Sequence, residues 1–189
     1  MSSTKLATRY AKSILDFAKE KGKMADVLAD MRMLNTAIDN NREFYMMLKS
    51  PIVNGDKKMA VVLNVFHDKI SDITENFIGI LMRKNRESHL PEIIDAFIAQ
   101  YNAFMHITPV TITTAHPISD DVQKTLLAKL KSTVGLEQIE LTTTIDESLI
   151  GGYILHWDDK MIDNSISRGL AILKDEFEGE AKNSYPLPH

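Results

Sequence analysis

Apolar residues in the first half of the chain recur every three to four positions, the period of an amphipathic helix. Leu6, Tyr10, Ile14 and Phe17 form such a stripe, and Gly22 follows it as a natural helix end. Five further stretches have the same period: 27–38, 44–48, 59–70, 73–81 and 94–105. The pattern therefore predicts six helices with short connections, which suggests an antiparallel bundle.

Residues at the expected helix ends support these boundaries. Pro51 disfavours a helical residue ahead of it, so the third helix should end near Ser50. Asp72 and Glu75 have the spacing of a capping box, with Asp where Ser or Thr is usual, and they predict the start of the fifth helix. Pro91 fits the first turn of the sixth helix.

Beyond residue 106 the period changes to two, as in a strand. Val110, Ile112 and Thr114 alternate with two threonines, and Ser165 is placed to cap a final helix. Strands are expected at 110–114, 139–145, 153–157 and 161–162, and helices at 122–130 and 166–177. The order β-α-β-β-β-α predicts a small α/β domain with a short mixed sheet.

These patterns predict an α+β protein with two domains. We expect a six-helix bundle over 1–106, a small α/β domain over 107–178 and a mobile tail over 179–189. The 189 residues have a net charge of −4, and the charge is distributed unevenly between the two predicted domains. Residues 1–106 hold 15 basic and 13 acidic residues, whereas residues 107–189 hold 7 and 13. Nine of the ten methionines also lie in the first part, so the two domains differ in character.

Composition excludes several classes of chemistry. The chain has no cysteine, which rules out disulfides, thiolate nucleophiles and cysteine-ligated zinc. It has neither GxxxxGK[ST] nor GxGxxG, and Gly151-Gly152 precede a strand rather than a helix, so no nucleotide cradle is expected. No apolar run approaches the roughly 18 residues of a membrane span, and no secretory signal opens the sequence. These features predict a soluble protein of a reducing compartment, without direct membrane insertion.

One cluster of polar residues could carry acid–base or metal chemistry. His156, Asp158, Asp159 and Asp163 lie close together in the sequence, and in a strand His156 and Asp158 point to the same face. Lys160 lies among them, however, and aspartates are common in turns, so a solvated turn is favoured by about ten to one. Without HExxH or GxSxG, we expect no catalytic residue, no metal and no cofactor; an enzyme using this cluster is the weaker alternative.

A second alternative is a helical adaptor or a nucleic-acid-binding protein. Arg83, Lys84 and Arg86 form the one local basic cluster, at the end of the fifth predicted helix. Cations at a helix C-terminus suit the helix dipole, which explains them without a nucleic acid. The surrounding charges are mixed, so we expect no nucleic-acid partner.

The helix predicted over 6–17 has an unusually wide apolar surface. Ala7 and Ala11 lie beside the larger stripe, and Ala18 continues the row of small residues. A helix buried on most sides explains this width about twice as well as a docking groove does. The alternative is a groove that receives an external amphipathic helix. The helix predicted over 72–81 is similarly wide.

The most specific segment of the chain is Leu149-Ile150-Gly151-Gly152-Tyr153-Ile154-Leu155, followed by Asp163, Ser165 and Leu170. With the opening Thr8–Ala18 and the stretch Asn76–Ile93, it resembles the delta subunit of the F-type ATP synthase, related to the mitochondrial oligomycin-sensitivity-conferring protein. The resemblance spans nearly the whole chain in the right order. Asn164 stands where the family usually has glycine, and asparagine also tolerates positive φ.

The resemblance implies a non-catalytic stator subunit. Family members join the catalytic head to the peripheral stalk, so that the head does not turn with the rotor during ATP synthesis. In the family, a groove between the first and fifth helices receives the N-terminal helix of an alpha subunit, and the C-terminal domain holds the stalk b subunit. The positions implied for the groove are Tyr10, Ala11, Ile14, Phe77, Ile80 and Leu81.

The resemblance assigns the remaining motif residues to the architecture of the second domain. Gly151 and Gly152 would form a turn, and Asp163 and Ser165 would belong to a hairpin and a helix cap. The implied location is the cytoplasmic face of the bacterial plasma membrane, as a peripheral part of the synthase complex.

Overall fold

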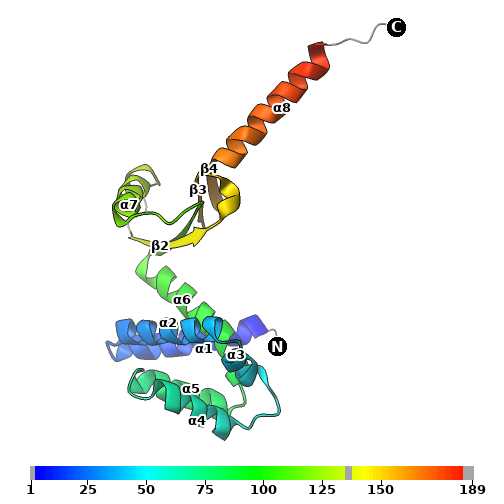
Figure 1. Ribbon diagram of the computed structural model, residues 1–189. Helices are drawn as coiled ribbons and strands as arrows, with labels where there is room; N and C mark the ends of the chain where they lie inside the picture. The colour runs from blue at the N-terminus through cyan, green and yellow to red at the C-terminus, as the bar shows by residue number, and fades with distance from the viewer. Residues whose placement is uncertain (1–2, 135–137, 185–189) are drawn as a thin grey trace. The chain divides into compact units, whose positions relative to one another are not determined.

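The computed structural model describes residues 3–134 and 138–184 and divides into two compact units, Met1–Met105 and His106–His189 (Figure 1). The described residues form eight α-helices and a four-stranded mixed sheet. The predicted α+β class is therefore confirmed. Among the described residues, no helix combines the length and the hydropathy that crossing a membrane requires.

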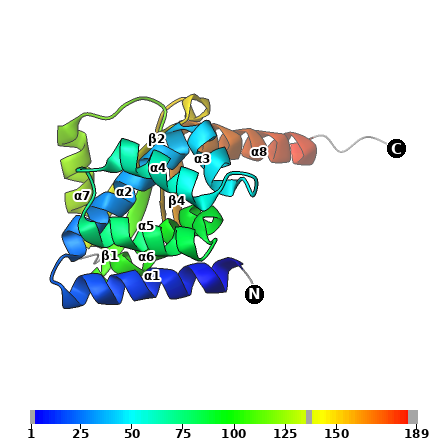
Figure 2. The ribbon, with the colours of Figure 1, turned by 90° about the horizontal axis from the view of Figure 1, so that it is seen from below.

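The first unit is helical. Its elements are α1 (Ser3–Glu20), α2 (Met24–Asn40), α3 (Arg42–Lys49), α4 (Gly55–Phe66), α5 (Asp72–Arg83), the 3-10 helix η1 (Glu87–His89) and α6 (Leu90–Met105). Helix α6 packs against α1 and α2, and α4 packs against α5. Leu34, Ile94 and Phe97 are fully buried between these helices. Helices α1 and α5 run alongside each other in opposite directions (Figures 1 and 2).

A buried carboxylate fixes the start of α5 to α2. Asp30, on α2, is 5% exposed, and its Oδ2 accepts hydrogen bonds from Ser71 N (2.9 Å), Ser71 Oγ (2.6 Å) and Thr74 Oγ1 (2.7 Å). Ser71 is the N-cap of α5, and its side chain accepts from the backbone N–H of Thr74. The cap is therefore Ser71 and not Asp72, because Ser71 is oriented by a residue that lies 41 positions earlier.

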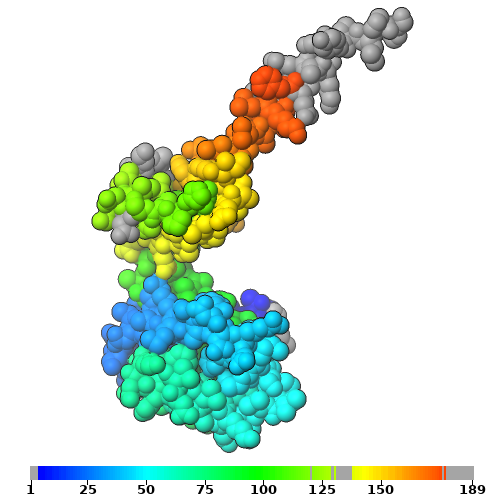
Figure 3. Space-filling view, viewed as in Figure 1, coloured from blue at the N-terminus to red at the C-terminus, as the bar shows by residue number. Residues whose placement is uncertain are grey.

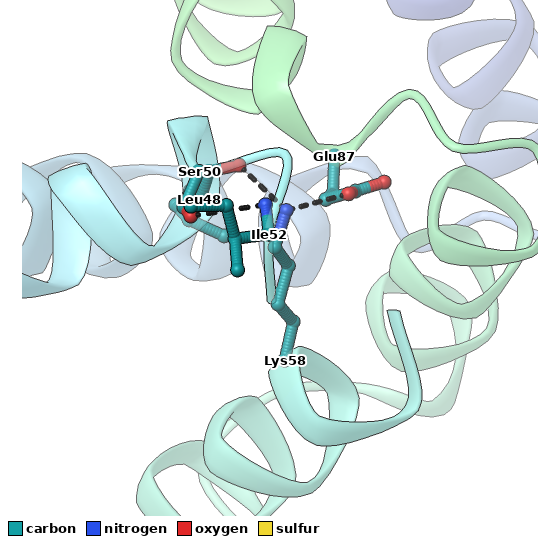
Figure 4. Close-up of polar contacts among 5 residues, drawn as sticks. All are labelled: Leu48, Ser50, Ile52, Lys58 and Glu87. Carbon is teal, nitrogen blue, oxygen red and sulfur yellow. Dashed lines mark hydrogen bonds and ion pairs between the residues drawn. The ribbon is translucent and has the colours of Figure 1, made fainter. Parts of the chain in front are cut away.

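A buried ion pair joins α3, α4 and η1 (Figure 4). Lys58 on α4 is 1% exposed, and its Nζ donates to the Leu48 carbonyl at 3.0 Å and to Glu87 Oε1 at 2.7 Å. Glu87 is also buried. Both charges therefore have a partner, which a buried ion requires. The pair holds the end of α3 and the start of η1 on α4.

The second unit is a small mixed sheet with two helices. Its elements are β1 (Ile107–Thr114), α7 (Asp120–Val134), β2 (Gln138–Ile145), the 3-10 helix η2 (Glu147–Leu149), β3 (Gly152–Trp157), β4 (Lys160–Ser165) and α8 (Ile166–Ser184). The strand order is β2-β1-β3-β4, with β1 parallel to β2 and the other pairs antiparallel. The order of elements along the chain is the one that the sequence predicts.

Apolar side chains that alternate along the strands form the core of this unit. Val110 lies opposite Leu141 on β2 and Trp157 on β3, so one face of the sheet is apolar. Leu130 of α7 is buried in the same cluster, and Leu126 packs against it. Helix α7 therefore covers this face.

Helix α8 is longer than the sequence predicts. It continues to Ser184, seven residues beyond the predicted end at 177; residues 185–189 lie outside the described part, and the mobile tail expected over 179–189 stays a prediction. Gly179 alone costs a helix about 1 kcal/mol relative to alanine, and the neighbouring Glu180, Ala181 and Lys182 are good helix formers. The glycine therefore does not end the helix.

Candidate functional site

An apolar groove lies between α1 and α5. Its volume is about 650 Å³, and its lining residues are Ser13, Ile14, Phe17, Lys21, Lys23, Asp72, Ile73, Asn76, Phe77 and Ile80. Phe17 and Ile80 both line the groove, and they remain 46% and 42% exposed although they are large apolar side chains. Contiguous exposed apolar surface of this kind marks sites where another molecule binds.

Aromatic packing sets the spacing of the groove walls. The rings of Tyr10 on α1 and Phe77 on α5 meet edge to face, with centroids 6.4 Å apart and planes at 66°. This geometry is favourable for aromatic pairs. The pair joins the two helices, and Ile14 is buried beside it on α1.

The structure brings together some of the residues that the family resemblance implies for the groove. Ile14, Phe77 and Ile80 line it, and Tyr10 contacts Phe77. Ala11 and Leu81 have no exposed surface, so they support the helices from the core instead of lining the groove. Docking of a partner helix stays a prediction.

Seven residues of the groove lining are absent from the predicted groove set, and two of them, Phe17 and Ile73, are apolar. Phe17 belongs to the apolar stripe of α1, so its place on the stripe was a usable signal. Ile73 lies in the first turn of α5, and no sequence pattern distinguishes it from a core residue. Which apolar residues stay uncovered depends on the neighbouring helices, which the period alone does not identify.

All charged residues of the groove lining lie at one end. Because α1 and α5 are antiparallel, Lys21 and Lys23, which follow α1, lie at the same end as Asp72, the first residue of α5. Lys21 Nζ lies 5.5 Å from the centroid of the Phe17 ring, a cation–π arrangement. Ser13 and Ile80 mark the other, uncharged end.

A second apolar groove of about 830 Å³ lies over α2, α3 and α4. Met33, Met47 and Val65 line it, and Phe44 and Phe66 pack with ring centroids 5.9 Å apart. Methionine adapts to irregular surfaces, so this groove combines adaptable and rigid side chains.

The second unit also presents an apolar surface, on α8. Ile166, Leu170, Leu173 and Phe177 are spaced by four, three and four residues, so they lie on one face. Each is between 50% and 69% exposed. The orange part of α8 extends beyond the sheet of its own unit in Figure 3, and it contacts that unit mainly at β4 and η2. The spacing is that of a helix that packs against another helix.

The glycine pair allows β3, β4 and α8 to meet closely. Gly152 has a φ of +78°, and a Cβ there would lie 2.3 Å from the Asn164 carbonyl oxygen. A Cβ on Gly151 would lie 2.7 Å from Ile166 Cδ1. Ile150 has the positive φ of +64° that the turn also needs. Asn164 lies in β4 opposite Tyr153, so its tolerance of positive φ is not used.

Asp163 and Ser165 join β4 to α8. Asp163 Oδ1 accepts the Ser165 N–H at 3.0 Å, and Ser165 Oγ accepts the Arg168 N–H at 3.2 Å, which caps α8. The hydrogen bond from Ser165 lowers the pKa of the Asp163 carboxyl, with a smaller contribution from Arg168 at 3.8 Å. Both residues therefore have an architectural explanation.

The other two clusters considered from the sequence are the polar residues around His156 and the basic residues at the end of α5. In the part of the chain that the structure describes, no three His, Cys, Asp or Glu side chains are placed to share a metal ion. His156 lies in β3, Asp158 lies in the turn with a φ of +47°, and Asp163 bonds Ser165. Arg83 and Lys84 end α5, where they complement the helix dipole.

Comparison with known proteins gives one consistent result. The sequence profile of the ATP synthase delta (OSCP) subunit matches residues 6–177. The ATP synthase subunit delta of Cytophaga hutchinsonii is 36% identical over 97% of this chain and 100% of its own length. The subunit delta of Christiangramia forsetii is 33% identical over 94% of this chain and 96% of its own length.

A solved structure has the same fold. A chain in the cryo-EM structure of the Toxoplasma gondii mitochondrial ATP synthase hexamer superposes with a TM-score of 0.68 at 25% identity. The match covers 96% of this chain and 99% of that chain.

Proposed function

Because this chain belongs to the ATP synthase delta (OSCP) family, we propose that it is the stator subunit that links the catalytic head of an F-type ATP synthase to the peripheral stalk. As a delta subunit it is a structural component of the synthase and not a catalytic one. Its role is then mechanical: it resists torque through two interfaces. The groove between α1 and α5 is the observation that carries the proposal.

The helical unit binds the head. In this proposal it acts as the six-helix bundle of the family, and its groove receives the N-terminal helix of the alpha subunit. Ile14, Phe77 and Ile80 offer apolar contacts along the groove, which suits a helix with anchors at i, i+3, i+4 and i+7. Tyr10 holds the walls together from the edge, and the core supports them from beneath.

The second unit binds the stalk. The exposed stripe on α8 suits a helix of the b subunit, because its four-three-four spacing is that of helices packed side by side. Residues 107–189 have six more acidic than basic residues, so basic groups on the stalk would assist encounter and register. Thus the proposal uses one helix-binding surface on each unit.

The subunit is a peripheral part of the complex. Its bacterial relatives are ATP synthase delta subunits, which supports our further proposal that it lies on the cytoplasmic face of the bacterial plasma membrane.

A matched pair of substitutions tests the head interface. The full chain is titrated with a synthetic peptide of the alpha-subunit N-terminus by calorimetry. Ile80→Lys places a charge in the groove and should weaken binding by about tenfold or more, since it buries an unpaired ammonium. Ile52→Lys makes the same change at a residue that is 93% exposed on the loop after α3, and should leave affinity unchanged.

Equal affinity of both variants and the wild type would contradict docking in this groove. Melting temperatures of the two variants establish that each is folded.

A further inference from the structure

We propose that Lys21 and Lys23 select the partner helix by charge and fix its direction in the groove between α1 and α5. The helix that fills the groove carries an acidic side chain at the end that lies beside these lysines. This inference rests on the proposed function, because it specifies the chemistry and the orientation of the helix that the groove receives.

The distribution of charge along the groove carries the argument. Only three of its lining residues are charged, and Lys21, Lys23 and Asp72 all lie at the end where α1 finishes and α5 begins. The opposite end, at Ser13 and Ile80, has no charged lining residue. A docked helix therefore meets two different environments at its two ends.

Among the residues that line the groove, those at the charged end have a positive balance. Two lysines face one aspartate, and the N-terminal backbone of the 12-residue α5 adds a partial positive charge. Lys23 immediately precedes α2. Both lysine side chains are exposed and lie at the rim, where they can reach a partner without losing their hydration first.

This balance discriminates between partner helices. A carboxylate at the charged end gains hydrogen bonds to an ammonium group, while a lysine or arginine there meets two like charges. The apolar walls accept an amphipathic helix in either direction, because apolar contact has little directional preference. Charge at one end removes that ambiguity: an acidic residue at the wrong end of the helix would reverse its orientation.

The first test compares two double charge reversals in the full chain. Lys21→Glu/Lys23→Glu should weaken binding of the alpha-subunit N-terminal peptide by about tenfold at about 0.05 M NaCl, and by much less at about 0.5 M NaCl. Lys5→Glu/Lys12→Glu makes the same charge change at exposed residues of α1 outside the groove lining, and should change affinity less than about twofold. Exchanging for lysine the acidic residue that this inference requires at the charged end of the peptide should restore binding to the first variant; a binding peptide without an acidic residue at that end would overturn the inference.

The second test measures direction. The chain has no cysteine, so Glu20→Cys gives a single site for a nitroxide label at the end of α1. The label should broaden the NMR signals of the acidic end of the peptide and leave those of its other end sharp. Broadening of the opposite end would overturn the proposed direction.

The outcomes separate this inference from the proposed function. If Lys21→Glu/Lys23→Glu leaves affinity unchanged while Ile80→Lys abolishes binding, the groove is used and selection by charge is wrong. If the peptide does not bind the wild-type chain, the proposed function fails and this inference fails with it.

Discussion

Lys58 and Glu87 place two charges in the core of the first unit, and each depends on the other. Lys58→Met removes the ammonium and leaves the Glu87 carboxylate buried and unpaired, so the free energy of unfolding should fall by about 3–5 kcal/mol. Lys58→Met/Glu87→Leu removes both charges and should recover most of this loss. Urea denaturation of the two variants measures the difference; a double variant that is less stable than the single one would contradict the account.

Asp163 links stability to pH. Because the Ser165 N–H lowers the pKa of its carboxyl, the folded pKa lies below the unfolded value of about 3.9. The ionised Asp163 carboxylate therefore contributes its full stabilisation of the fold above about pH 4, and this contribution is lost as pH falls through the folded pKa. Asp163→Asn should reduce the dependence of unfolding free energy on pH below about pH 4, as measured by urea titrations at several pH values. If the unfolding free energies of the variant and the wild type depend on pH in the same way, Asp163 does not make this contribution.

At the scale of elements, Asp30 determines where α5 begins and thereby how one wall of the groove lies. Asp30→Ala leaves the hydroxyls of Ser71 and Thr74 without their shared acceptor, so stability should fall by about 3 kcal/mol. The alpha peptide should also bind more weakly, although Asp30 does not line the groove. Calorimetry below the melting transition checks the second effect. Unchanged affinity in a destabilised variant would show that Asp30 supports the fold alone.

Sequence patterns predict the elements better than the contacts between them. The stripe at Ile14 and Phe17 follows from a period of 3.6, and the strand at Val110 and Ile112 from a period of two. The pairing of Asp30 with Ser71 joins residues 41 positions apart, which no local pattern encodes. The sequence predicts the α5 cap at Asp72, one residue late, because Asp72 and Glu75 also have the spacing of a capping box.

The groove between α1 and α5 is predicted only in part, because its exposed residues also depend on packing between helices. The helical period shows that Ile14, Phe77 and Ile80 belong to apolar stripes. Whether a residue of a stripe is exposed depends on the neighbouring helices, which leave Ile80 exposed and cover Ala11 and Leu81. The glycine pair is a clearer signal, because Gly152 has a backbone conformation that side chains rarely adopt and a carbonyl at the position of its missing Cβ.

At the scale of the whole molecule, the two units differ as the two ends of a connector would. The first carries a groove with a positive rim, and the second carries an acidic sequence and an exposed helical stripe. Leu173→Lys on α8 should therefore abolish binding of a stalk b fragment and leave the alpha peptide bound. Ile80→Lys should have the reverse effect. Paired titrations of both variants with both ligands check this independence.

The most direct measurement of the stator function is sedimentation of the full chain with the alpha-subunit N-terminal peptide and the b fragment together. If the chain is a connector, a ternary complex should form that contains one copy of the chain and both ligands. The affinity of the chain for each ligand should be unchanged by the other ligand. Ligands that exclude each other, or a b fragment that does not bind this chain, would contradict the account.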